Sequence, residues 1–373
     1  MTSPRFFARI KLINPSQSVV KDTDALRIGI LGAANIAPPA LIGAAKHLRS
    51  IIVVSVAARD PAKAKAFADK NGIPNTHASY DALIADPEID CIYNPLPNGL
   101  HYEWTCKALE AGKHVLLEKP ATSNEAQAKD LVALAQSKNL VLLEAFHYRF
   151  HPASQKFREL VQTHIASGHP IQKIQAVMSF PTAFGKDDIR FNYKLAGGIN
   201  MDAGCYTINS IRYFSGLEVE SVEEAKPKII SENIDGRMEA TLRLKGGAEA
   251  KLIASLTNPW FSVQTYREVF PKFTLETDDK IFTFGVFVIP GVYHYITVKD
   301  KATGKTENLP KQYGEGGFST YTHQLEAFVK AVKSGNNKDV VNAIPGWVTG
   351  EDTIANMRVV DAVYKKAGMI LRE

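Results

Sequence analysis

The chain has 373 residues, of which 45% are apolar and 22% charged, so it can form ordinary globular cores, and its length favours two domains. The formal net charge is only +5, and no dense cluster of lysine and arginine with interleaved aromatic residues occurs, which argues against nucleic-acid binding. No apolar run is long enough to span a membrane, and three widely separated cysteines fit a reducing compartment such as the cytoplasm.

Residues 1–25 precede the first predicted strand and contain no acidic residue before Asp22. Apolar residues alternate there with basic ones, among them Arg5, Arg9 and Lys11. We expect an arm or a short amphipathic helix that packs on the rest of the chain. A mitochondrial presequence is the alternative, although arginines and serines are few for such a segment.

A nucleotide-binding layout follows the arm. Residues 26–31 predict a strand, and the sequence Gly32-Ala33-Ala34-Asn35-Ile36-Ala37 leads into a helix that we expect to end near His47. A strand, a tight turn and a helix in this order place a helix N-terminus against the pyrophosphate of a dinucleotide. Gly32 supplies the turn, but alanines replace the second and third glycines of the usual motif, so the motif is weak by itself.

The second predicted strand, residues 51–58, bears on the choice of cofactor. Proteins that bind NAD usually have an acidic residue at the end of this strand, which binds the free 2′-hydroxyl of the ribose. Here Ala58 occupies the strand end and Arg59 follows, and a guanidinium suits a 2′-phosphate. The sequence therefore favours NADP, with NAD possible. The alternative is that Arg59 only lies in solvent.

Helices and strands continue to alternate up to residue 146. Helices are expected at 62–70, after Ser79, up to Glu110 and at 124–138, and strands at 89–93, 113–117 and 140–143. Right-handed crossovers then give an α/β domain with a doubly wound, mostly parallel sheet. Ligands bind at the carboxyl ends of the strands of such a sheet, which is where Glu118, Lys119 and Pro120 follow an apolar strand.

The second half predicts an α+β domain. A helix is expected at 152–166, and strand-like segments follow at 174–180, 218–228, 236–244, 248–256, 264–269, 272–277, 280–284 and 293–299. Helices at 320–333 and 351–366 complete the pattern. These segments indicate a large, mainly antiparallel sheet with helices on one face and an open second face. We therefore expect an arm at 1–25, a dinucleotide-binding domain at 26–146, and a substrate-binding and dimerisation domain at 147–373.

A helix after Gly197 and Gly198 carries the polar residues of greatest interest. Asp202, Tyr206 and two further polar residues, Asn209 and Tyr213, are spaced so that they share one helical face. A neighbouring face is apolar. By default such a pattern predicts an amphipathic surface helix, but the two preceding glycines permit a close approach of another group.

Four motifs together resemble the glucose-fructose oxidoreductase / inositol dehydrogenase family. They are the sequence Gly32 to Ala37, Pro95-Leu96-Pro97-Asn98 with His101, Glu118-Lys119-Pro120, and Gly197-Gly198-Ile199-Asn200-Met201-Asp202 with Tyr206. The resemblance covers nearly the whole chain after residue 26. Tyr206 in place of histidine, together with Glu144-Ala145-Phe146 and Arg149-Phe150, is most similar to the branch of NADP-dependent D-xylose 1-dehydrogenases and dimeric dihydrodiol dehydrogenases.

The resemblance implies a Rossmann domain that binds NADP, followed by an α+β domain whose open sheet face pairs two copies. It assigns cofactor binding to Gly32, Ala33, Ala34, Asn35, Ile36, Arg59, Pro95, Leu96, Asn98, His101, Glu118 and Lys119. It implies oxidation of a carbinol, such as the anomeric hydroxyl of an aldose. A trans-dihydrodiol or dicarbonyl substrate, and a non-catalytic nucleotide-sensing regulator, are the alternatives. Lys119 and Tyr206 argue against a regulator, because a sensor has no need of a proton-transfer pair.

Tyr206 is our candidate for the acid/base, with Asp202 as the carboxylate that orients the site. Because the unperturbed pKa of tyrosine is about 10, Tyr206 needs help near neutrality, which the Lys119 ammonium and the positive nicotinamide would supply. Lys119 as the base is the variant that stays open. Candidate substrate contacts are His147, Tyr148 and Arg149, in addition to Asp202 and Tyr206. No metal site is expected, because the ten histidines do not form a ligand-spaced cluster in the sequence.

Overall fold

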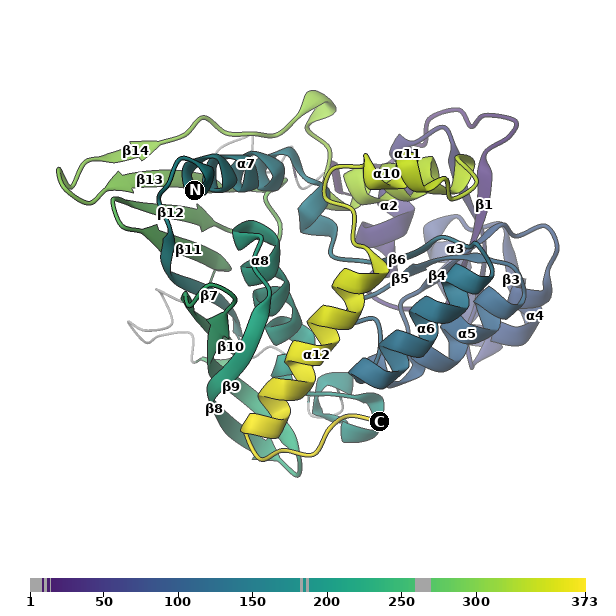
Figure 1. The fold of residues 1–373 in the computed structure, drawn as a ribbon. Helices are drawn as coiled ribbons and strands as arrows, with labels where there is room; N and C mark the ends of the chain where they lie inside the picture. Colours follow the sequence, from purple (N-terminus) through teal and green to yellow (C-terminus); the bar gives the residue numbers. More distant parts are fainter. Residues whose placement is uncertain (1–8, 10–11, 14, 182–183, 186–187, 259–269) are drawn as a thin grey trace. The chain divides into compact units, whose positions relative to one another are not determined.

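The computed structural model describes the whole chain except residues 1–8, 10–11, 14, 182–183, 186–187 and 259–269 (Figure 1). The predicted strand at 264–269 and most of the first fourteen residues of the arm therefore lie outside the described residues. The chain divides into two compact units. The first unit comprises the described residues up to 122, with 126–151 and 314–354, and the second comprises 123–125, 152–313 and 355–373.

The first unit is built on a six-stranded sheet with the order β3-β2-β1-β4-β5-β6. Its strands are β1 (Leu26–Leu31), β2 (Ile51–Ala57), β3 (Asn75–His77), β4 (Cys91–Asn94), β5 (His114–Leu117) and β6 (Leu142–Glu144). Every neighbouring pair is parallel. The near-continuous apolar runs of β1, β4 and β5 fit strands that are buried on both faces. The predicted doubly wound, parallel sheet is confirmed.

Helices connect these strands, and several begin at a side-chain cap. They are η1 (Pro38–Ile42) with α2 (Gly43–His47), α3 (Pro61–Asn71), α4 (Tyr80–Ala85), η2 (Asn98–Leu100), α5 (His101–Glu110), α6 (Glu125–Ser137) and η3 (His147–Phe150). Asp60 caps α3 and Ser79 caps α4 by accepting backbone N–H bonds. The later segments η7 (Glu315–Gly317), α10 (Thr320–Lys333) and α11 (Lys338–Asn342) return to this unit.

The described part of the arm packs against α2. The backbone N–H of Val19 donates to the carbonyl of Lys46 at 2.9 Å, and the Lys21 ammonium donates to the carbonyls of Ala45 and Leu48 at 2.5 and 2.6 Å. These bonds tie the arm to the C-terminal end of α2, where the Ala45 carbonyl also accepts from the Leu48 N–H at 3.1 Å.

The second unit contains an eight-stranded sheet with the order β14-β13-β12-β11-β7-β10-β9-β8. Its strands are β7 (Ile171–Pro181), β8 (Val219–Ser231), β9 (Ile234–Leu244), β10 (Glu249–Asn258), β11 (Lys272–Thr277), β12 (Lys280–Gly285), β13 (Tyr295–Asp300) and β14 (Thr306–Asn308). Only the pair β7–β10 is parallel. The prediction of a large, mainly antiparallel sheet is confirmed.

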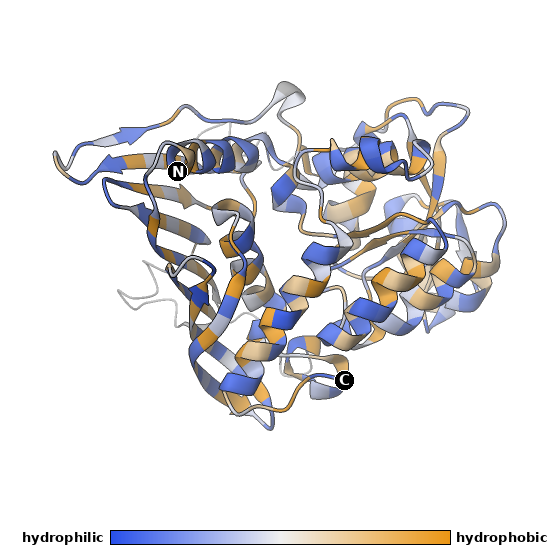
Figure 2. Cartoon of the chain, in the orientation of Figure 1, coloured by the Kyte–Doolittle hydropathy of each residue, from blue (hydrophilic) through white to orange (hydrophobic). Residues whose placement is uncertain are grey.

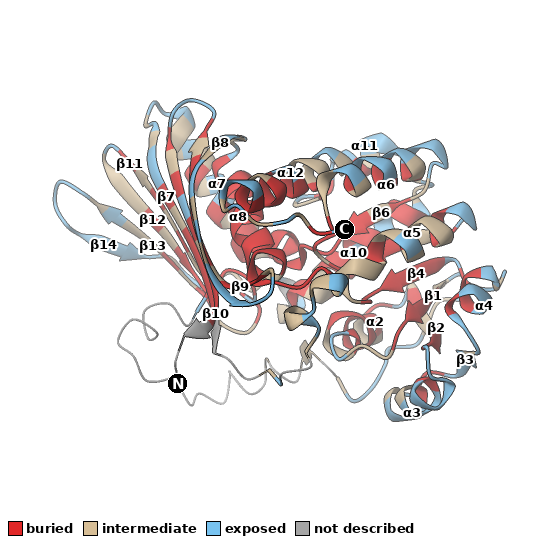
Figure 3. Ribbon diagram, turned by 90° about the horizontal axis from the view of Figure 1, so that it is seen from below, coloured by how far each residue is buried: buried red, intermediate tan, exposed pale blue. Residues whose placement is uncertain are grey.

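One face of this sheet is covered by the helices α7 (Pro152–Ala166) and α8 (Cys205–Ser215) (Figure 3). Buried and partly exposed residues alternate along β9 and β11, as a sheet covered on one face requires. Apolar and polar residues alternate visibly along the strands (Figure 2). The last helix, α12 (Gly350–Lys366), begins in the first unit and continues in the second.

Among the described residues, no helix combines the length and the apolar character that a bilayer span requires. Cys91, Cys106 and Cys205 are free thiols; Cys91 and Cys205 are buried.

Candidate active site

The turn after β1 has the properties of a phosphate cradle. Gly32 has a φ of 89°, which favours glycine, and a Cβ there would lie 2.9 Å from the side chain of Leu96. The Gly32 N–H donates to the carbonyl of Ala57 at 2.7 Å, which ties the turn to the end of β2. The backbone N–H groups of residues 33–36 donate to no other group in the described part of the chain. They are therefore available to an anion.

Arg59 lies exposed directly after β2 and Ala58. The neighbouring Asp60 accepts a hydrogen bond from the Ala62 N–H at 2.9 Å and caps α3. The Tyr80 hydroxyl interacts with the Arg59 backbone, and the Tyr80 ring packs edge-on against Trp104. The backbone at the strand end is thus held by Tyr80, while the Arg59 residue is exposed.

The proline-rich turn after β4 is held by buried side chains. Asn94 is fully buried and donates to the Thr105 hydroxyl at 2.9 Å. The two ring nitrogens of His101 lie 2.8 and 2.7 Å from the carbonyl oxygens of Pro120 and Leu96. Burial and, to a smaller degree, the charge of Lys119 lower the pKa of His101 to about 4, so the neutral ring donates to only one carbonyl at pH 7. Of the other predicted cofactor residues in this turn, Pro95 is buried and Asn98 is half-buried.

Glu118 and Lys119 come directly after β5, where the apolar strand ends. Glu118 is buried and accepts a hydrogen bond of 2.6 Å from the Tyr93 hydroxyl. Lys119 is half-buried, and its peptide bond to Pro120 is cis. Its charge is close enough to His101 and His147 to lower the pKa of both. The structure therefore brings these three predicted site residues together.

The predicted substrate contacts at 147–149 follow β6 and are all buried. His147 Nδ1 lies 2.8 Å from the Thr320 hydroxyl, and burial, followed by the Lys119 charge, lowers the pKa of His147 to about 3. Arg149 donates to the Trp347 carbonyl at 2.6 Å and forms a 3.0 Å ion pair with Asp352. These contacts give Arg149 a structural role within the first unit.

Glu144, at the end of β6, bonds to the backbone close to Lys119. Sequence reasoning did not assign it to the site. One of its carboxylate oxygens accepts from the Ala121 N–H at 2.9 Å and the other from the Thr353 hydroxyl at 2.8 Å. Burial raises the pKa of Glu144 to about 7. The carboxyl group thus holds the backbone two residues after Lys119.

In the second unit, Asp202 lies in a π-helical turn, η6 (Asn200–Gly204), that leads into α8. All residues of α8, including Tyr206 and Asn209, are buried. The default interpretation of this segment as an amphipathic surface helix is therefore wrong. Its polar face is covered by other parts of the chain, which a local sequence pattern does not reveal.

Asp202 is held by Arg190, which sequence reasoning missed. Arg190 Nε donates to Asp202 at 2.7 Å, its Nη1 lies 3.1 Å from Asp188, and its guanidinium covers the Phe184 ring. The Asp202 side chain remains 16% exposed, so it is accessible as well as oriented. The only sequence signal for this pair was that Asp188 and Arg190 lie shortly before Gly197.

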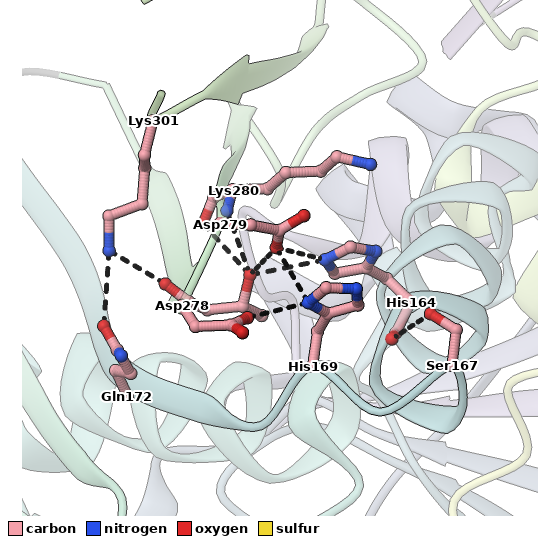
Figure 4. A network of polar contacts seen from close by, with 9 residues as sticks. His164, Ser167, His169, Gln172, Asp278, Asp279, Lys280 and Lys301 are labelled. Atoms are coloured by element: carbon pink, nitrogen blue, oxygen red, sulfur yellow. Dashed lines mark hydrogen bonds and ion pairs between the residues drawn. The ribbon is translucent and has the colours of Figure 1, made fainter. Parts of the chain in front are cut away.

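A cluster of His164, His169 and Asp279 lies near the end of α7 and the β11–β12 turn (Figure 4). The expectation that the histidines do not cluster with acids is not met here. However, the two imidazole rings are stacked in parallel, 4.3 Å apart and within 4°, so no point lies in both ring planes. One metal ion cannot accept both in-plane lone pairs in this arrangement. The ring nitrogens instead contact Asp279 at 2.7 and 3.3 Å.

Two family models match the chain. Residues 26–146 match the model described as an oxidoreductase family with an NAD-binding Rossmann fold, and residues 157–269 match the GFO/IDH/MocA C-terminal domain. The chain belongs to the GFO/IDH/MocA oxidoreductase family. The family that the four sequence motifs resemble is thereby confirmed.

Relatives within this family extend the comparison. The chain is 32% identical to a D-xylose 1-dehydrogenase (NADP(+)) from Haloferax volcanii over 92% of this chain and 97% of the relative. It is 34% identical to a trans-1,2-dihydrobenzene-1,2-diol dehydrogenase from Xenopus tropicalis over 55% of this chain and 61% of that one. A crystal structure of a 3-ketoreductase from Actinomadura kijaniata, in complex with NADP and TDP-benzene, matches with a TM-score of 0.77 and 26% identity over 92% of this chain and 98% of the other.

The raised pKa of Glu144 predicts a measurable pH dependence. A folded-state pKa near 7 means that Glu144 contributes stability below about pH 4.5 and that this contribution, about 3 kcal/mol, is lost as the pH rises through 7. Glu144→Gln cannot ionise, and its amide can still accept from Ala121 and donate to Thr353. Urea unfolding from pH 5 to 8 should therefore show the variant gaining stability relative to wild type. The exposed Glu110→Gln should show no such trend, and parallel curves for Glu144→Gln would contradict the prediction.

Proposed function

We propose that this protein is an NADP-dependent dehydrogenase that oxidises a sugar carbinol, with the anomeric hydroxyl of an aldose such as D-xylose as the reacting group. The observation that carries the proposal is the 32% identity with an NADP-dependent D-xylose 1-dehydrogenase over nearly the full length of both chains. The bound cofactor would supply the acceptor for the hydride that leaves the carbinol carbon.

The first unit fits such a cofactor. The partly exposed turn of residues 33–36 would offer backbone N–H groups to the pyrophosphate, and Gly32 keeps the space beside Leu96 free of a side chain. Arg59 would hold the 2′-phosphate. The remaining residues that we propose to line the cofactor site are Pro95, Leu96, Asn98, His101, Glu118 and Lys119.

Tyr206 is the residue that we propose to take the proton from the substrate hydroxyl. Its burial in α8 and the glycines that precede it support this role, and Asp202, oriented by Arg190, would hold the sugar. Lys119 would donate a hydrogen bond to the hydroxyl and favour the phenolate by its charge. Lys119 as the base remains the variant of this mechanism. His147 and Tyr148 would shape the substrate pocket, and Arg149 would act through its ion pair with Asp352.

A trans-dihydrodiol substrate is the second candidate, favoured by the relative from Xenopus tropicalis. The same residues would serve it, so the two candidates differ in the pocket and not in the chemistry. A screen of aldoses and dihydrodiols with NADP and NAD, followed at the absorbance of the reduced nicotinamide, separates them. Turnover of dihydrodiols alone would overturn the sugar assignment, and turnover of neither class would overturn the proposed function.

Removal of the Tyr206 hydroxyl tests the proton-transfer role. Tyr206→Phe should lower kcat by about two to four orders of magnitude while cofactor binding, measured by nucleotide fluorescence, stays near normal. Lys119→Ala should cause a similar loss, and the double variant should be little worse than either single one if the two residues act as a unit. Tyr213→Phe, on the same buried helix, is the control and should retain turnover. Near-normal turnover in Tyr206→Phe would exclude the role.

Arg59 tests the cofactor assignment. A charge-assisted contact with the 2′-phosphate is worth about 1.5–3 kcal/mol, so Arg59→Ala should raise the Michaelis constant for NADP about ten- to a hundredfold and leave NAD kinetics nearly unchanged. Introducing an acid at Ala58 should shift the preference further towards NAD. Arg49→Ala, which removes another exposed guanidinium of the first unit, is the control. Equal losses with both cofactors, or none, would show that Arg59 does not bind the phosphate.

We propose further that the open face of the eight-stranded sheet pairs two copies of this chain, as the family resemblance implies. A row of partly exposed polar residues crosses four neighbouring strands there: Gln175, Thr274, Thr283 and Thr297. Uncharged side chains in this row would let a second sheet face, related by a two-fold axis, approach without charge repulsion.

A bulky charge in this row should prevent dimerisation. Thr274→Arg is expected to convert a dimer into a monomer in sedimentation velocity at micromolar concentration, because an isologous interface buries the new bulky charge in both copies. Thr303→Arg, in the exposed β13–β14 turn, should leave the dimer intact. A wild-type protein that sediments as a monomer, or a dimer that tolerates Thr274→Arg, would contradict the assignment of this face.

A further inference from the structure

We propose that a buried network of Arg372, Asp235 and Tyr364 positions the turn that carries Asp202 and begins the helix of Tyr206. This inference rests on the proposed function of those two residues. The three members of the network touch neither the turn's reactive side chains nor any proposed substrate contact in the described structure. They are positioning residues, and they act through the backbone of residues 197–201.

The network occupies space that only a glycine leaves open. Gly198 has a φ of 119°, and a Cβ at this position would lie 2.2 Å from Asp235 Oδ1, 2.8 Å from Arg372 Nη2 and 2.9 Å from the Tyr364 hydroxyl. Three polar side chains therefore converge where a side chain of residue 198 would be. The close approach that the two glycines predicted is thus made by this chain's own charged residues.

The network is fully removed from solvent. The side chains of Arg372 and Asp235 are both 0% exposed, and Arg372 Nη2 lies 3.2 Å from Asp235 Oδ1. The Tyr364 hydroxyl donates to the same oxygen at 3.0 Å. The guanidinium lies between the rings of Tyr193 and Tyr364, at 4.9 and 4.3 Å from their centroids. A buried ion pair is weak evidence for stability, because apolar residues of similar volume often stabilise a fold as well.

Bonds on both sides of Gly198 connect the network to the turn, and the Tyr364 hydroxyl also interacts with the Met201 backbone. Arg372 Nε donates to the Gly197 carbonyl at 2.8 Å, and the Asn200 N–H donates to Asp235 Oδ2 at 2.8 Å. Arg372 therefore holds the Gly197 carbonyl, and Asp235 holds the Asn200 N–H. These bonds set the direction in which the chain enters η6 and α8.

The same turn also fixes the partner of Asp202. The Gly198 N–H donates to the Arg190 carbonyl at 2.9 Å, and the Asp202 N–H donates to the Gly198 carbonyl at 3.2 Å. The Arg190 side chain in turn binds the Asp202 carboxylate at 2.7 Å. A shift of the turn would therefore move the Asp202 backbone and the guanidinium that orients its side chain together.

The test compares three network variants with a matched control. Tyr364→Phe removes one hydroxyl, Asp235→Asn removes the charge but keeps the shape, and Arg372→Lys keeps the charge but removes the fork. Arg212→Lys is the control, because Arg212 is a buried arginine of the same helix, only 4% exposed, whose 2.7 Å ion pair with Glu218 lies at the far end of α8. If Asp235→Asn and Arg372→Lys fail to fold, Tyr364→Phe alone still tests the proposal.

Two readouts distinguish positioning from general stability. In the network variants we expect faster amide hydrogen exchange confined to residues 197–206 and a fall in kcat of about tenfold or more. The Michaelis constant for NADP should stay within twofold. Arg212→Lys should lower the melting temperature without either effect. If the network variants melt earlier but match the control in exchange and kcat, the positioning role is overturned.

The experiment that would disprove the proposed function is distinct from the one that would disprove the positioning role. Wild-type protein without turnover on any aldose or dihydrodiol would remove that function, whereas the exchange pattern in residues 197–206 would still decide whether the network fixes the turn.

Discussion

The parallel pairing of β1, β4 and β5 is the constraint on which the first unit depends. Strands buried on both faces are mostly apolar along their length, so polar side chains gather where the strands end. Gly32, Asn94, Glu118 and Glu144 stand at four such ends. Because all six strands run the same way, these ends share one edge of the sheet. Polar residues collect at this edge as a consequence of how the core is built.

Burial at this edge decides which groups carry charge. Each polar side chain has partners, as for Glu118 with Tyr93 and for Glu144 with Ala121 and Thr353. His101 and His147 are kept neutral by burial and by the nearby ammonium of Lys119. The imidazoles therefore add no positive charge beside the lysine.

Local patterns predicted most elements, and long-range contacts account for what they missed. The strand at 272–277 and the helix at 320–333 have the predicted bounds, because apolar periodicity and caps are local. The strand β14 is short and wholly exposed, so it had no apolar signal. The Arg190–Asp202 pair was within reach of sequence reasoning, whereas Arg372 approaches Gly197 from 175 positions away, which one sequence does not reveal. The complete burial of α8 likewise depends on distant segments.

The return of residues 314–354 to the first unit makes that unit discontinuous in the sequence. His147 reaches Thr320, Arg149 reaches Asp352 and Glu144 reaches Thr353 across roughly two hundred residues. During synthesis, the six parallel strands leave the ribosome long before these partners exist. The edge of the nucleotide-binding sheet that carries Lys119 therefore stays incompletely packed until the intervening sheet and residues 314–354 have been translated. A ribosome-bound chain that stops before residue 320 has the cofactor motif but not the segment that completes its surroundings.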